Sequence, residues 1–217
     1  PYNWNYKMLN LEAAWDKQKG EDSSTEIIVA VLDTGIAPNH PDLAGNQIPG
    51  YDFIDDDPEP FDTEYGGTWA SHGTHVAGII SAVTNNETGI AGVSWNVKIM
   101  PIRVLDSRGN GTAGALVEGI NWAVNNGAKV INLSLDVTGP KPDDDDDTKS
   151  VRDAIKNAFN QGVTVIAAAG NDGIPTVAFP ANCESVIAVA ALDHTGAKAS
   201  YSNYGSEIDF CAPGGGI

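Results

Sequence analysis

Three polar side chains stand where apolar stretches of the sequence end or a helical stretch begins, and together they could support acyl transfer. Asp33 follows Val-Ala-Val-Leu, His72 opens His-Gly-Thr-His-Val-Ala-Gly, and Asn171 follows Ala-Ala-Ala-Gly. A carboxylate can orient an imidazole, the imidazole can act as a general base, and an amide can donate a hydrogen bond to an oxyanion. Each residue alone is also typical of an ordinary cap, surface position or turn. The fourth requirement of this chemistry is a nucleophile.

The order of apolar and amphipathic stretches predicts the fold that would bring these residues together. Strand-length apolar runs cover residues 27–32, 97–105, 129–135, 163–168 and 186–191. Helical stretches cover residues 72–83, 112–125 and 148–160, and Gly127 and Gly162 follow the last two. Strands this uniformly apolar are typical of a parallel sheet buried on both faces. We therefore expect one α/β domain over residues 1–217, with a doubly wound, mostly parallel central sheet and helices on both faces.

Composition limits the partners of the chain. Its 217 residues include 12 basic and 29 acidic side chains, giving a formal charge of -17, and 41% of the residues are hydrophobic. Such a chain can bury a core, but it offers no cationic patch for nucleic acid or an anionic membrane. No apolar run approaches the roughly 18 to 20 residues of a membrane span. The first residues do not resemble a signal peptide, which suggests a cytosolic or trimmed protein, and the start at Pro1 favours trimming.

Two acidic stretches and two cysteines leave alternatives open. The stretches cover residues 52–64 and 140–147, and the second contains five consecutive Asp. Because that run precedes a helical stretch, a solvated approach to a helix N-terminus is favoured over a metal site. Cys183 and Cys211 lie 28 residues apart and could form a bridge or remain two thiols. They lack the further ligands of a zinc site.

In combination, the motifs resemble the subtilisin-like serine proteases, the subtilases, and are closest in pattern to thermitase-type members. The resemblance runs from about Leu11 to Ile217. It rests on Val31-Leu-Asp-Thr-Gly35, His40-Pro-Asp-Leu43, His72-Gly-Thr-His-Val-Ala-Gly78, Val130-Ile-Asn-Leu-Ser-Leu135, Ala168-Ala-Gly-Asn171, Tyr201-Ser-Asn-Tyr-Gly205 and Ala212-Pro-Gly214. The resemblance implies a subtilisin-like fold and a secreted endopeptidase.

The resemblance also implies roles for individual residues. Asp33 would orient His72, His72 would take the proton of the nucleophile, and Asn171 would donate to the oxyanion. An extended peptide or protein substrate would lie between two backbone segments as an added strand. The substrate-binding residues would be Gly109, Asn110, Gly111, Ser134, Leu135, Asp136, Ala168, Ala169 and Gly170. Family members usually have Gly where Asp136 stands, so we expect a preference for basic or small side chains nearby.

Calcium is the cofactor that the resemblance implies. Residues 82–90 look like the calcium loop of thermitase-type members. Its ligands would be Asp42, Val83, Asn86, Thr88 and Ile90, and oxygen donors of this kind suit the ion. The family's N-terminal carboxylate ligand would fall before Pro1. A second calcium site would lie around Asp52, Asp55, Asp57 and Glu59, where the alternative is a solvated acidic loop.

The family's nucleophile lies in a Gly-Thr-Ser motif, which does not occur in these 217 residues. We therefore expect the chain alone to be inactive and incomplete at its C-terminal end. A Ser-bearing C-terminal segment or second chain would be its partner, and a propeptide or protein inhibitor could also bind. The alternative is a catalytically inactive fragment or a peptide-binding pseudoprotease.

Two further classes fit single motifs. Asp33-Thr-Gly35 matches half of an aspartic-protease site, but that chemistry needs a second carboxylate and no second such motif occurs. Gly109-Asn-Gly111-Thr-Ala-Gly114 matches the spacing of a dinucleotide-binding loop, with Asp136 about 20 residues further on. Asp106-Ser-Arg108 separates that loop from its strand, and the reading leaves Asp33, His72 and Asn171 unexplained.

Overall fold

A seven-stranded parallel sheet forms the centre of the molecule. The computed structural model describes residues 4–19, 26–62, 64–65, 68–69, 71–137 and 145–215. The strands, in spatial order, are β2 (Tyr51–Asp52), β5 (Lys98–Arg103), β1 (Ile28–Asp33), β6 (Val130–Leu133), β7 (Thr164–Ala168), β8 (Val186–Leu192) and β9 (Phe210–Pro213). All neighbouring pairs in this sheet are parallel. The predicted doubly wound α/β fold is confirmed.

The central strand β1 shows why the apolar runs are continuous. Ala30 and Leu32 contact the core cluster on one face of the sheet, whereas Val29 and Val31 contact the cluster on the other. Successive side chains of a strand point to opposite faces, so a strand covered on both sides needs apolar residues at every position.

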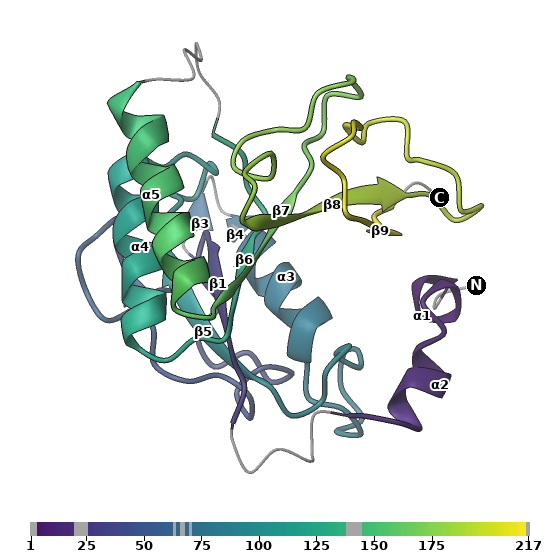
Figure 1. The fold of residues 1–217 in the computed structure, drawn as a ribbon. Coiled ribbons are helices and arrows are strands. Elements are labelled where there is room, and N and C mark those ends of the chain that lie inside the picture. Colours follow the sequence, from purple (N-terminus) through teal and green to yellow (C-terminus); the bar gives the residue numbers. More distant parts are fainter. Residues whose placement is uncertain are drawn as a thin grey trace.

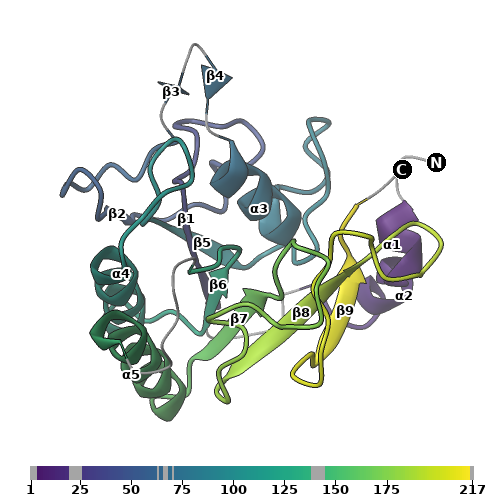
Figure 2. The ribbon, with the colours of Figure 1, turned by 90° about the horizontal axis from the view of Figure 1, so that it is seen from above.

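Helices cover both faces, as Figures 1 and 2 show. α3 (His72–Ser81) lies on one face, and α4 (Ala113–Asn125) and α5 (Asp146–Asn160) lie side by side on the other. Asp145 from the aspartate run caps α5 by accepting a hydrogen bond from the Thr148 N–H at 2.7 Å. This confirms the helix-approach interpretation for the described part of the run. Residues 140–144 lie outside the described residues.

Several elements carried too little pattern to be predicted. They are β2, β9, the hairpin strands β3 (Glu64–Tyr65) and β4 (Thr68–Trp69), and the helices α1 (Trp4–Met8) and α2 (Leu11–Trp15). Strands of two residues have no periodicity to detect. The strands predicted at 97–105 and 129–135 do form, as β5 and β6, but both are shorter than predicted at each end. Within the described residues, no helix combines the length and apolarity needed to cross a bilayer.

The N-terminal helices pack against a segment far along the chain. Tyr6 donates its hydroxyl hydrogen bond to the Ala91 carbonyl, and Trp15 Nε1 donates to the Val93 carbonyl at 2.8 Å. The rings of Trp15 and Trp95 lie 5.3 Å apart. The N-terminal helices therefore support the loop that follows α3.

Both cysteines are free thiols. Cys183 is buried and Cys211 is exposed on β9. The structure thus decides against the disulfide alternative.

Candidate active site

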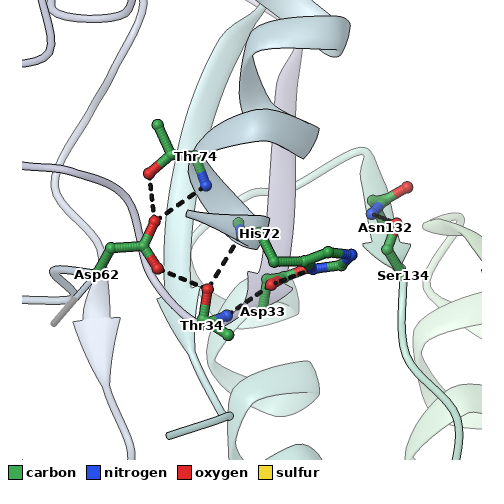
Figure 3. Close-up of polar contacts among 8 residues, drawn as sticks. Asp33, Thr34, Asp62, His72, Thr74, Asn132 and Ser134 are labelled. Carbon is green, nitrogen blue, oxygen red and sulfur yellow. Dashed lines mark hydrogen bonds and ion pairs between the residues drawn. The ribbon is translucent and has the colours of Figure 1, made fainter. Parts of the chain in front are cut away.

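The strongest feature at the carboxyl edge of the sheet is an aspartate–histidine pair. Asp33 is the last residue of β1 and His72 is the first residue of α3. The Nδ1 atom of His72 lies 2.8 and 2.9 Å from the two carboxylate oxygens of Asp33 (Figure 3). The Asp33 side chain is fully buried, whereas that of His72 is 55% exposed. The carboxylate thus fixes one ring nitrogen and leaves much of the ring accessible.

The buried carboxylate changes the acidity of the imidazole. Its hydrogen bond to His72 raises the pKa of the imidazole above the usual value, outweighing the opposing effect of burial. Asp33 also accepts a hydrogen bond from the Thr34 N–H at 2.7 Å. With Nδ1 held by Asp33 as a donor, Nε2 is the atom that can accept a proton.

Close contact between β1 and α3 requires glycine at position 73. A Cβ atom there would lie 2.2 Å from the Gly35 carbonyl oxygen and 3.1 Å from the Asp33 Cβ. Only a residue without a side chain lets the first turn of α3 approach the end of β1 this closely. The glycine at position 73 is therefore explained by the close packing of α3 against the end of β1.

A second buried carboxylate, Asp62, was missed by the sequence reasoning. It has no exposed surface and accepts hydrogen bonds from the hydroxyl groups of Thr34 and Thr74. The Thr34 and Thr74 positions flank the predicted catalytic pair (Figure 3). An isolated aspartate near the end of an acidic stretch gave no signal of its own.

Asn171 lies on a tight turn that begins directly after β7. Gly170 has a positive φ of 105°, and Asn203 is buried with 1% exposure beside it. The Asn203 Oδ1 accepts hydrogen bonds from the Asp172 and Ile174 N–H groups at 2.9 and 3.3 Å. The Asn203 side chain therefore holds the backbone that presents Asn171.

The predicted substrate-binding residues border two adjoining clefts. The first has a volume of about 400 Å³ and includes His72, Gly109, Ser134, Leu135, Asp136, Ala168, Gly170 and Asn171. The second, of about 160 Å³, adds Asn110 and Gly111 and shares Gly109, Leu135 and Asp136 with the first. The two loops after β5 and β6 thus form the walls of one groove that ends at His72.

Two details of the groove differ from expectation. Ala169 does not line it, because this side chain turns into the core and is only 2% exposed. Arg108, which the sequence reasoning did not select, lines the same cleft as Asp136. The groove therefore contains side chains of both charges near the histidine.

Asp42 meets the predicted calcium loop. Its carboxylate accepts hydrogen bonds from Asn86 Nδ2 at 2.8 Å and from the Ile90 N–H at 2.9 Å, and its carbonyl accepts from the Val83 N–H. The pocket beside this loop is lined by residues 84–91, Thr88 included, and by Tyr6. The loop carries the carboxylate, amide and carbonyl oxygens that a hard cation prefers, but in this structure both Asp42 carboxylate oxygens accept hydrogen bonds from N–H groups.

Three carboxylates of the second calcium prediction, Asp52, Asp55 and Asp57, have other partners. Asp52 accepts a hydrogen bond from the Arg103 guanidinium at 2.6 Å, and the same Nη1 contacts Asp55. Asp57 Oδ1 accepts from the Glu59 N–H at 2.8 Å. This set does not fit a calcium ion, because Arg103 already supplies the positive charge. Among the residues that the structure covers, no three His, Cys, Asp or Glu side chains are grouped to hold a metal.

Comparisons with known proteins agree with this geometry. A family model described as "Subtilase family" matches residues 24–216. The thermophilic serine proteinase of Bacillus sp. (strain AK1) is 44% identical over 213 residues, covering 98% of this chain and 49% of the relative. Thermitase of Thermoactinomyces vulgaris is 43% identical over 204 residues, covering 94% and 67%. The extracellular protease of Xanthomonas campestris is 40% identical, covering 96% and 40%.

A solved protease structure from Pseudoalteromonas arctica superposes with a TM-score of 0.85 at 38% identity. The match covers 99% of this chain and 70% of that structure. The chain thus spans about half to two thirds of the length of the first two relatives. The family match decides against the dinucleotide-binding interpretation. The pairing of Asp33 with a histidine, and not with a second aspartate, also decides against the aspartic-protease interpretation.

Gly170 allows a test of the turn that presents Asn171. A Cβ at position 170 would lie 2.3 Å from Asn203 Nδ2, whereas a Cβ at Gly196, which also has a positive φ of 84°, would meet nothing within 4 Å. We expect Gly196→Ala to cost about 1 to 2 kcal/mol from backbone strain alone. Gly170→Ala should lower the free energy of unfolding by more, measured by denaturant titration of the full-length protein. Equal losses in the two variants would show that the Asn203 contact is unimportant.

Proposed function

Because this chain belongs to the subtilase family, we propose that the full-length protein is a serine endopeptidase in which Asp33, His72 and Asn171 are catalytic residues. The observation that carries the proposal is the buried Asp33 carboxylate within 2.9 Å of the His72 Nδ1, at the end of a groove lined by Asn171. In this arrangement His72 Nε2 takes the proton of the nucleophile and returns it to the leaving amine. Asp33 holds the ring and stabilises the imidazolium.

The nucleophile is proposed to be a serine outside these 217 residues. Ser202 cannot replace it, because its Oγ is buried and bonded to the Ala191 N–H and the Asn203 carbonyl. Ser134 follows β6 and its Oγ accepts a hydrogen bond from Asn132 Nδ2 at 2.9 Å. Neither serine contacts His72 through a hydrogen bond among those described.

The substrate is proposed to be an extended peptide segment of a protein. The groove walls are exposed backbone of the loops after β5 and β6, which can pair with an added strand. Such pairing reads the main chain of the substrate more than its sequence. Asn171 is proposed to donate its amide N–H to the oxyanion that forms at the scissile carbonyl, since it lines the same cleft as His72.

Charge in the groove is proposed to set a preference among substrates. Asp136 borders both clefts, so a substrate side chain bound at their junction lies close to its carboxylate. A basic side chain there gains an ion pair, and an acidic one is repelled. Arg108 on the opposite wall moderates this preference for side chains that reach it.

Calcium is proposed to bind at the loop that follows α3. Asp42, with 3% exposure, would supply the carboxylate, and the carbonyls of Val83, Thr88 and Ile90 would supply further oxygens. Asn86, whose Nδ2 donates to Asp42 in this structure, would turn its amide oxygen to the ion. The ion would add cohesion between the start of the chain and this loop, since Tyr6 already contacts Ala91. It takes no part in the proton transfers.

Secretion is proposed on the names of relatives, among them the extracellular protease of Xanthomonas campestris. A formal charge of -17 suits a protein with no anionic partner surface. A propeptide or protein inhibitor would occupy the same groove as the substrate.

The catalytic assignment predicts that the full-length protein hydrolyses peptides and reacts with a serine-directed phosphonate. Asn171→Ala should lower kcat roughly 100- to 1000-fold, a magnitude taken from a subtilisin rather than derived from this chain. Asn126→Ala, at an exposed asparagine after α4, is the matched control and should leave kcat unchanged. Labelling that is lost only when a residue other than the Gly-Thr-Ser serine is changed would refute the assignment. A full-length protein that binds peptides without cleaving them would favour the pseudoprotease alternative.

The substrate preference predicts a difference between basic and acidic side chains. Across peptides varied at the positions before the scissile bond, kcat/KM should be highest where a basic or small side chain lies near Asp136. Asp136→Gly should reduce the ratio of kcat/KM for basic over neutral peptides several-fold, and Asp209→Gly should not. A preference for acidic side chains in the unaltered enzyme would overturn this proposal.

The calcium site predicts a cation-dependent Tm. Adding Ca²⁺ to the chelated full-length protein should raise its Tm, because a ligand that binds only the folded state stabilises it. Asp42→Asn should remove most of the increase, and Asp52→Asn should leave the increase in place although it lowers Tm by breaking the Arg103 pair. Identical Tm values with Ca²⁺ and with chelator would contradict the site.

A further inference from the structure

The helix that carries His72 begins without a cap of its own. Ser71 precedes α3 but makes no side-chain capping hydrogen bond, and the first turn contains no acidic residue. The first N–H groups of a helix have no partner within the helix and need acceptors from elsewhere. For α3 these acceptors come from two segments distant in sequence.

Thr34 and Asp62 supply the cap. The Gly73 N–H donates to Thr34 Oγ1 at 3.1 Å, and the Thr74 N–H donates to Asp62 Oδ2 at 3.2 Å. Thr34 directly follows Asp33 at the end of β1. The start of α3 is therefore tied to the strand that carries the catalytic carboxylate, and Asp62 joins the two.

The direction of each hydrogen bond follows from the backbone donors. Thr34 Oγ1 accepts from Gly73, so its proton is free to go to Asp62 Oδ1, 2.6 Å away. Thr74 Oγ1 accepts from the Ala37 N–H at 2.8 Å, so its proton goes to Asp62 Oδ2. All three donors around Asp62 therefore point at its oxygens, which suits a carboxylate and leaves no role for an amide NH₂ group.

The backbone of Asp62 is fixed as well. Its N–H donates to the Ile36 carbonyl at 3.2 Å, and the Ile36 N–H donates to the Pro60 carbonyl at 3.0 Å. A Cβ at Gly35 would clash with the backbone of Phe61 and Asp62 at 2.6 to 2.7 Å, so the two segments are in direct contact. The carboxylate is thus held in place by its own chain and can act as a rigid reference.

We propose that Asp62 is a positioning residue that holds the first turn of α3 against the end of β1 and so keeps His72 in register with Asp33. The proposal rests on the proposed function for its kinetic consequences. Asp62 does not touch substrate, because it is fully buried. It acts through Thr34 and Thr74.

The charge of Asp62 also reaches the imidazole. Together with the hydrogen bond that His72 donates to Asp33, the negative charge of Asp62 raises the pKa of His72. Desolvation raises the pKa of Asp62 itself, and the three hydrogen bonds oppose that rise. Among the described residues, the charged side chains that line the cleft beside His72 are Arg108 and Asp136.

The test is Asp62→Asn in the full-length protein. The asparagine side chain would carry no charge, and its NH₂ group would face one of the Thr34 and Thr74 donors that Asp62 accepts from. We expect kcat to fall about 100-fold with little change in KM, the size of effect that a small misplacement of a catalytic group produces. Because the pKa of His72 falls when the charge is removed, and His72 must be neutral to act as a base, the acid limb of the kcat/KM profile should move to lower pH. Asp209→Asn, which also removes a carboxylate bonded to a backbone N–H, should change neither.

A second measurement does not depend on turnover. The His72 Nδ1 proton, shared with Asp33, should give a downfield NMR resonance that weakens or moves upfield in Asp62→Asn. If the unaltered protein hydrolyses no peptide, the proposed function fails, and this resonance still decides the role of Asp62. A resonance and a pH profile like those of the unaltered protein would overturn the positioning role.

A pair of variants at Thr74 covers the case in which Asp62→Asn does not fold. Thr74→Ser keeps the hydroxyl that donates to Asp62, and Thr74→Val keeps the volume but removes the hydroxyl. We expect Thr74→Ser to retain most of the unaltered kcat and the NMR resonance, and Thr74→Val to lose both. Equal behaviour of the two variants would refute a role for the hydrogen bonds.

Discussion

The oxygens of a carboxylate without exposed surface need hydrogen-bond donors from the protein, and Asp33 imposes that condition on the whole site. Its oxygens need the Thr34 N–H and the His72 ring, so the end of β1 and the start of α3 must lie in contact. The contact in turn requires glycine at position 73, and the first turn of α3 finds its acceptors outside its own segment. The residue types at positions 33, 34, 72 and 73 therefore follow from one buried carboxyl group.

The turn that carries Asn171 is also held by a buried polar side chain that accepts hydrogen bonds from backbone N–H groups. There a buried asparagine, Asn203, accepts from two backbone N–H groups of a segment some thirty residues earlier. In both places a buried polar side chain holds the backbone next to an exposed functional group. The His72 and Asn171 side chains therefore do not have to pack into the core, and they remain accessible to a substrate.

Sequence patterns predicted the parallel sheet, its covering helices, and the Asp33, His72 and Asn171 positions, because apolar runs and residues after them report directly on burial and on strand ends. They could not predict Asp62 or Asn203, since a polar residue becomes a support only when segments distant in sequence meet. They also placed Ala169 in the groove, although the alternation after β7 turns it inward. The resemblance left the acidic loop around Asp52 open between a calcium site and a solvated loop, because the sequence does not show that Arg103 faces these carboxylates.

Arg103 provides this loop with a positive charge that does not depend on a bound metal ion. A metal ion dissociates when its concentration falls, but Arg103 is the last residue of β5 and cannot be diluted or removed by a chelator. Its side chain is only 5% exposed and contacts Asp52, the last residue of the short strand β2. The edge of the sheet at β2 therefore carries its own counterion, and part of the negative charge of this loop is neutralised by the chain itself rather than by ions from the surroundings.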